Sequence, residues 1–163
     1  MVDDARAGAE EPAFEIEPSE LDELTHREML GLYADAESNV RFAKGLQWKT
    51  MGGTIAIFTL LVTAVHTIED PGLLSRVGMI LSVAVSGGAI YALTIYQAWQ
   101  KTERNKINTI LPHLSTLARQ VHGVRSRSEA NVYRYILLSF MVILIVMANY
   151  VTYLMLQPYF VAK

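Results

Sequence analysis

The sequence predicts an all-α membrane protein, in which three transmembrane helices are joined to two cytosolic amphipathic helices. Of its 163 residues, 52% are hydrophobic, and the apolar residues gather in three blocks at about 51–68, 77–99 and 135–157. Each block is close to the length that a helix needs to cross the hydrocarbon core of a bilayer. Bases gather at one end of these blocks, which predicts the direction in which the chain crosses.

Residues 1–18 are predicted to form a disordered acidic tail. Residues 1–23 contain nine acids and a single base, Arg6, and the first 18 residues include two prolines and few large apolar side chains. Such a segment cannot bury enough surface to offset the entropy lost on ordering.

Residues 19–49 are predicted to form a cytosolic amphipathic helix. Ser19 is suited to cap its amino terminus, with Asp22 three residues later at the position of a capping-box acid. One face then carries residues at steps of three or four, which is the periodicity of a helix; they are Leu21, Thr25, Met29, Leu32, Ala36, Val40, Ala43 and Leu46. We expect this helix to continue into the first span, with Gly45 and Gly52-Gly53 as its weakest points.

Residues 50–163 are predicted to form a three-span membrane domain. The first span ends at Glu69-Asp70-Pro71-Gly72, a turn sequence that cannot continue a helix. The second span carries small residues at four-residue spacing, which lets helices approach closely in lipid. The predicted helix-packing interface is therefore Gly78, Ser82, Ser86 and Gly88 of the second span, with Asn149 of the third.

The loop 100–132 is predicted to contain the second amphipathic helix, partly as an extension of the second span and interrupted at Pro112. Leu114, Leu117 and Val121 lie on its apolar stripe and form the predicted cytosolic partner face. Two arrangements stay open. The stripe can pack on helix 19–49 in a small bundle, or the basic back of the helix can lie on anionic headgroups.

The bases predict a cytoplasmic amino terminus and an outer carboxyl terminus. On the predicted outer side the chain has only Arg76 and Lys163. The bases on the predicted inner side are Arg41, Lys44, Lys49, Lys101, Arg104, Lys106, Arg119, Arg125, Arg127 and Arg134.

No group of residues in the sequence predicts catalysis. The chain has no cysteine, no glycine loop for phosphate, no HExxH and no GxSxG. The single ionisable group inside a span is His66, near Glu69 and Asp70. It is either an interfacial histidine bonded to the turn or a metal, proton or haem site. We expect no enzyme activity, no cofactor, no metal and no nucleic-acid partner.

The approach to the first span resembles that of assorted small bacterial inner-membrane proteins to which no activity is attached. The matching residues are Tyr33, Asn39, Arg41, Phe42, Ala43, Lys44, Gln47 and Trp48. The resemblance implies a multi-pass protein of the bacterial inner membrane. A looser likeness links the chain to the SLATT-type domains of bacterial conflict systems, which pair a membrane hairpin with cytosolic helices; the third span departs from that pattern.

These observations predict a non-catalytic accessory or scaffold subunit of a larger inner-membrane assembly. Its expected partners are the lipid bilayer and other membrane-protein subunits or a second copy of the chain. The alternative function is a self-assembling pore or a stress or defence effector, which the resemblance to SLATT-type domains favours.

Overall fold

The described residues form helices joined by short turns. The computed structural model describes residues 18–69, 71–123 and 127–161, so the predicted tail lies outside it except for Pro18. Three helices, α1, α2 and α4, are each long and apolar enough to cross a membrane, which confirms the all-α prediction and the three apolar segments. The elements are α1 (Glu23–Thr67), α2 (Gly72–Ile110), the 3-10 helix η1 (Leu111–His113), α3 (Thr116–Gly123), α4 (Arg127–Leu156) and α5 (Pro158–Val161).

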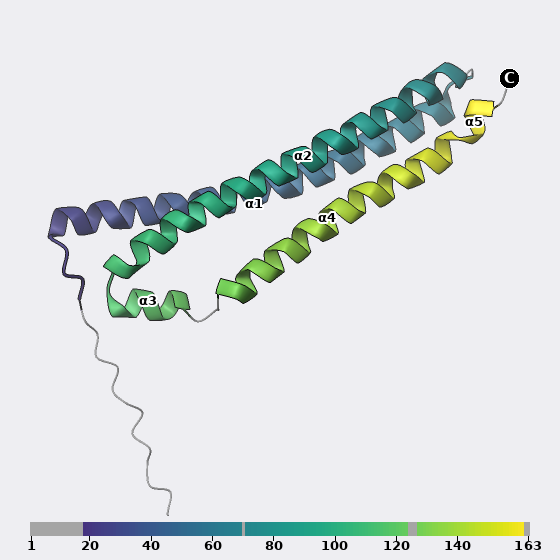
Figure 1. Ribbon diagram of the computed structural model, residues 1–163. Helices are drawn as coiled ribbons and strands as arrows, with labels where there is room; N and C mark the ends of the chain where they lie inside the picture. Colours follow the sequence, from purple (N-terminus) through teal and green to yellow (C-terminus); the bar gives the residue numbers. More distant parts are fainter. Residues whose placement is uncertain (1–17, 70, 124–126, 162–163) are drawn as a thin grey trace, which may run out of the picture.

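The long helices lie side by side. α1 and α2 form an antiparallel hairpin along most of their length, and α4 runs beside them (Figure 1). α5 lies at the end where α1 turns into α2, whereas η1 and α3 lie at the opposite end, near the amino terminus of α1 (Figure 1). α2 contacts α1, α4 and α5, so it is the central helix of the bundle.

The amino terminus of α1 differs from the prediction. Asp22, not Ser19, is the N-cap: its Oδ1 accepts from the backbone N–H of Thr25 at 3.0 Å. Two hydrogen bonds from Thr25 lower the pKa of the Asp22 carboxyl. The bond from the Thr25 hydroxyl has the larger effect, and the bond from its backbone N–H has the smaller one. Ser19 instead donates its hydroxyl to the carbonyl oxygen of His113 at 3.1 Å, which ties the entry of α1 to η1.

α1 is one continuous helix of 45 residues, as the sequence predicted, and is about 67 Å long. It passes through Gly45 and Gly52-Gly53 without a break. It ends at Thr67, and α2 begins at Gly72, so the predicted turn is confirmed.

The hydrophobic core joins α2 to α4. Leu93, Met141 and Ile145 are fully buried, together with Ala89, and Met51 of α1 packs against the same cluster. Because these side chains come from all three long helices, the cluster holds the bundle together near its middle.

α2 extends well past its apolar segment and ends at Ile110, just before the predicted break at Pro112. Ile107, Ile110 and Leu114 are buried in this region. The predicted stripe of helix 19–49 is only partly buried: Ala36 and Ala43 are covered, but Leu32 is 52% exposed. The predicted pairing is therefore made by the extension of α2 along α1, whereas the short α3 lies against η1.

Candidate functional site

The predicted helix-packing residues divide between the inside and the outside of the bundle. Gly78 and Ser82 are buried within the chain, and a Cβ at Gly78 would lie 3.4 Å from Cδ1 of Leu156. Ser86 is partly buried and donates to the carbonyl of Ser82, whereas Gly88 is exposed with no atom within 4 Å of an added Cβ. Asn149 is partly buried, and its Nδ2 finds no partner among the described residues.

The residues of the predicted cytosolic partner face also differ in their exposure. Leu114 is buried within the chain, so it is not presented to a partner, and Leu117 is exposed. The side chain of Val121 lies outside the described residues.

His66 lies at the α1–α2 turn end of the bundle. Its Nδ1 lies 2.9 Å from the carbonyl oxygen of Val62, and its ring makes an edge contact with Tyr159 at 5.0 Å between centroids. In the part of the chain that the structure describes, no three His, Asp or Glu side chains gather in a group able to hold a metal ion. His66 is therefore hydrogen-bonded to its own helix, and not to the described residues of the turn as the sequence had predicted.

Three glutamines form a buried cluster between α1 and α2 that the sequence did not predict. Gln47, Gln97 and Gln100 are 3%, 7% and 3% exposed. Gln47 donates from Nε2 to Oε1 of Gln97 at 3.3 Å and to the carbonyl of Leu93 at 3.4 Å. Its Oε1 accepts from Nε2 of Gln100 at 2.9 Å. These hydrogen bonds join α1 to α2 at this level, although Nε2 of Gln97 has no partner among the described residues.

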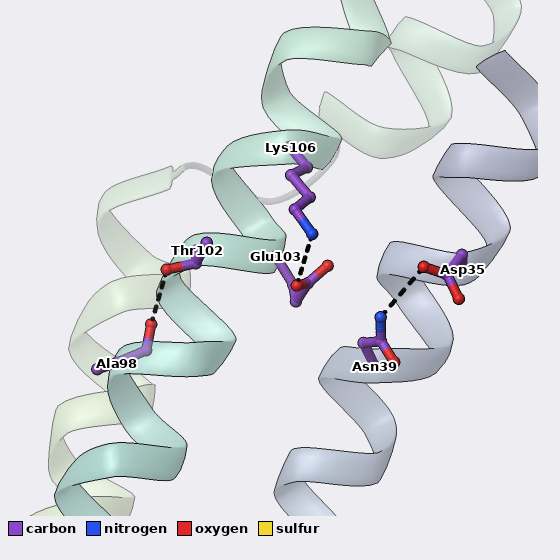
Figure 2. A network of polar contacts seen from close by, with 6 residues as sticks. All are labelled: Asp35, Asn39, Ala98, Thr102, Glu103 and Lys106. Carbon is purple, nitrogen blue, oxygen red and sulfur yellow. Dashed lines mark hydrogen bonds and ion pairs between the residues drawn. The ribbon is translucent and has the colours of Figure 1, made fainter.

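A carboxylate continues the same buried row toward η1. The side chain of Glu103 is only 4% exposed. Its Oε1 accepts a hydrogen bond from Nζ of Lys106 at 2.8 Å. Glu103 projects from α2 toward α1, where Asn39 donates to Asp35 (Figure 2). The hydrogen bond from Lys106 lowers the pKa of Glu103 although burial opposes this, so the carboxylate stays ionised at neutral pH.

Beside the glutamine cluster, residues of α1, α2, η1, α3 and α4 line a basic pocket with a volume of about 1200 Å³. Glu37 is the single acid among the described residues that line it, and it is paired with Arg41 at 3.4 Å. Tyr133, Tyr135 and Leu137 of α4 line it as well. Its bases come from α1 (Arg41, Lys44), α2 (Lys101, Arg104), α3 (Arg119) and α4 (Arg134).

Two of these arginines face the pocket with incomplete hydrogen bonding. The Nε atoms of Arg104 and Arg134 are buried and have no partner among the described residues. The pKa of Arg104 is lowered, mainly by burial and to a smaller extent by the positive charge of Arg134. The two guanidinium groups therefore repel one another, and an anion between them would relieve that repulsion.

Sequence reasoning missed both features, although the glutamines carried a signal. Gln97, Gln100 and Glu103 continue the helical spacing of the buried residues Ala89 and Leu93. A polar residue in phase with a buried stripe indicates a buried hydrogen bond rather than a solvated side chain. The basic pocket had no comparable signal, because its lining comes from five separate helical elements.

Comparison of the chain with models of known protein families, with characterised proteins and with solved structures found no match in any of the three. The functional assignment therefore depends on the geometry of the chain itself.

Proposed function

We propose that the chain is a non-catalytic, three-span protein of the bacterial inner membrane that serves as an accessory or scaffold subunit of a larger assembly. The observation that carries the membrane placement is the uncovered apolar surface of the three long helices. Leu60 of α1, Ile80 of α2 and Ile136 of α4 are 69%, 74% and 59% exposed. Side chains of this kind in water would form a large apolar patch, whereas in lipid they face a matching solvent.

The charge distribution supports a cytoplasmic amino terminus. The uncharged segments are 50–68, 77–100 and 135–162, apart from the titratable His66, and the bases of the basic pocket flank all three at one end. At the opposite end Arg76 follows the α1–α2 turn, and Glu69 is exposed there. Flanking lysines and arginines favour the cytoplasmic side.

Labelling of introduced cysteines is expected to show this orientation. The chain has no cysteine of its own, so E28C near the start of α1 and E69C at the turn would be unique, and both positions are exposed. In sealed spheroplasts a membrane-impermeant maleimide should label E69C, and it should label E28C only after the membrane is opened.

The unmodified chain, which cannot react, is the control. If E28C were labelled in sealed spheroplasts and E69C were not, the amino terminus would lie outside, opposite to the proposed orientation. Equal labelling of both positions would show that the chain does not span the membrane.

An uncovered glycine surface on α2 supports assembly with a further helix. Gly88 is exposed and lies between Ala84 and Ala92, one turn to each side. Small residues at this spacing let a second helix approach closely enough for backbone contact. Gly87 is also exposed, but its neighbours one turn away are Val83 and Tyr91, which keep another helix at a distance.

Substituting Gly88→Leu is therefore expected to remove assembly without harming the fold, because no atom lies within 4 Å of a Cβ at either glycine. The measurement is the mass of the complex extracted gently from its native membrane, together with the identity of whatever accompanies it. We expect wild type and Gly87→Leu to carry a larger partner in fixed stoichiometry, and Gly88→Leu to lose it.

A complex that Gly88→Leu leaves intact would contradict this interface. A homo-oligomer without any companion would contradict the accessory role itself. Leakage of ions from liposomes that contain only this protein would then establish the pore alternative.

A further inference from the structure

The basic pocket lies at the level where all three long helices change from uncharged to charged residues. Lys44 and Gln47 line it just before the uncharged segment of α1, and Lys101 and Arg104 line it just after that of α2. Arg134 lines it immediately before the uncharged segment of α4. If the uncharged segments lie in the hydrocarbon core, the pocket lies at the depth of the lipid phosphates.

The lining of the pocket also changes from apolar to charged, going from the uncharged segments toward α3. Leu137 and Tyr135 lie on the side of the uncharged segments, whereas Arg119 of α3 lies on the opposite side. An amphiphilic molecule with a phosphate next to an apolar chain matches both parts of this lining.

The positive charges of the described lining exceed its negative charges. Of the six bases among the described residues that line the pocket, Arg41 has a carboxylate partner, Glu37. Arg104 and Arg134 each keep a buried Nε without a partner in the described residues. Guanidinium groups bind phosphate oxygens through strong, paired hydrogen bonds, so a phosphate group in the pocket would supply the negative charge that neither arginine finds among the described residues.

We propose that the basic pocket is a binding site for the phosphate group of an anionic phospholipid, held by Arg104 and Arg134. Arg119 closes the pocket from α3, and Tyr135 and Leu137 contact the glycerol and the first acyl carbons. A basic pocket between helices on the cytoplasmic side of a membrane protein suits such a headgroup. The inference rests on the membrane placement proposed above. A soluble phosphate compound has the same charged group, so the test separates the two sources.

The test uses the purified full-length protein in a nonionic detergent and follows its thermal midpoint during titration. Three additives are compared at the same ionic strength: phosphatidylglycerol, phosphatidylcholine with the same acyl chains, and inorganic phosphate. A ligand that binds only the folded state raises the midpoint with its concentration. We expect phosphatidylglycerol alone to raise it.

The variants Arg104→Gln and Arg134→Gln are expected to weaken the apparent affinity for phosphatidylglycerol about tenfold or more, which is the effect of losing hydrogen bonds to a charged group. Arg119→Gln should weaken it as well. Arg119 is exposed on α3, so this variant tests the site even if the two buried arginines prove necessary for folding. Lys49→Gln is the matched control, because Lys49 is exposed and does not line the pocket.

An equal response to phosphatidylglycerol in Lys49→Gln and Arg119→Gln would overturn the site, since general charge attraction would then explain the binding. An equal response to both phospholipids, or to inorganic phosphate alone, would overturn the anionic phospholipid as ligand. Cysteine labelling that shows a spanning chain, combined with no response to phosphatidylglycerol, would reject this inference and leave the proposed function standing.

Discussion

Replacing Leu93 with alanine is expected to lower the free energy of unfolding by about 2–5 kcal/mol. Leu93 has no exposed surface and lies in the cluster with Met141 and Ile145. Inside a membrane the loss comes mainly from missing packing contacts, because lipid tails solvate an apolar side chain as well as the core does. The cavity would lie between α2 and α4, in the buried cluster that joins them.

The measurement is reversible unfolding of wild type and Leu93→Ala in the same detergent, monitored by helical circular dichroism. Ile80→Ala is the matched control, since Ile80 lies on the same helix but is 74% exposed. It should unfold within about 0.5 kcal/mol of wild type. If the two variants were equally stable, the cluster would not hold the bundle together.

Replacing Gln47 with alanine is expected to destabilise the α1–α2 hairpin by about 2–3 kcal/mol. The substitution leaves Nε2 of Gln100 and Oε1 of Gln97 without their partner, and both side chains are almost fully buried. Much of the effect is the desolvation of the two remaining amides rather than the strength of the lost hydrogen bonds. Gln120→Ala, on the exposed surface of α3, should have no comparable effect.

A triple variant separates this explanation from simple loss of volume. Replacing Gln47, Gln97 and Gln100 together with leucine removes every amide of the cluster and keeps side chains of similar size. We expect the triple variant to be more stable than Gln47→Ala, because no buried amide is left unsatisfied. A triple variant as unstable as Gln47→Ala would show that shape, and not hydrogen bonding, governs this contact.

The long helices and most of their ends were predictable because each depends on local sequence. A run of apolar residues, a Pro-Gly turn and a proline after Leu111 act over a few positions, and the structure follows them. The N-cap was displaced by three residues because both Ser19 and Asp22 suit that position. Ser19 does not cap the helix because its hydroxyl donates to the carbonyl oxygen of His113, 94 residues away.

The candidate site was not predictable in the same way, because its parts are distant in sequence. Gln47 and Gln100 are 53 positions apart, and the pairing of α1 with α2 brings them together. Small residues at regular spacing predicted close helix packing, but not which of them face inward. Leu156 covers Gly78 from the end of α4, whereas Gly88 stays uncovered. That difference depends on where α4 crosses α2, which no local pattern specifies.

The unbroken course of α1 has a mechanical consequence. Because no loop interrupts the helix, tilting its apolar half would also move its polar half. The part from Glu23 to Lys49 is about 40 Å long, and a tilt of about 10° would carry its tip by about 7 Å. If the apolar half of α1 lies in a bilayer, as proposed above, a change in the tilt of that half would therefore also displace the amino-terminal tip, because no loop lies between the two.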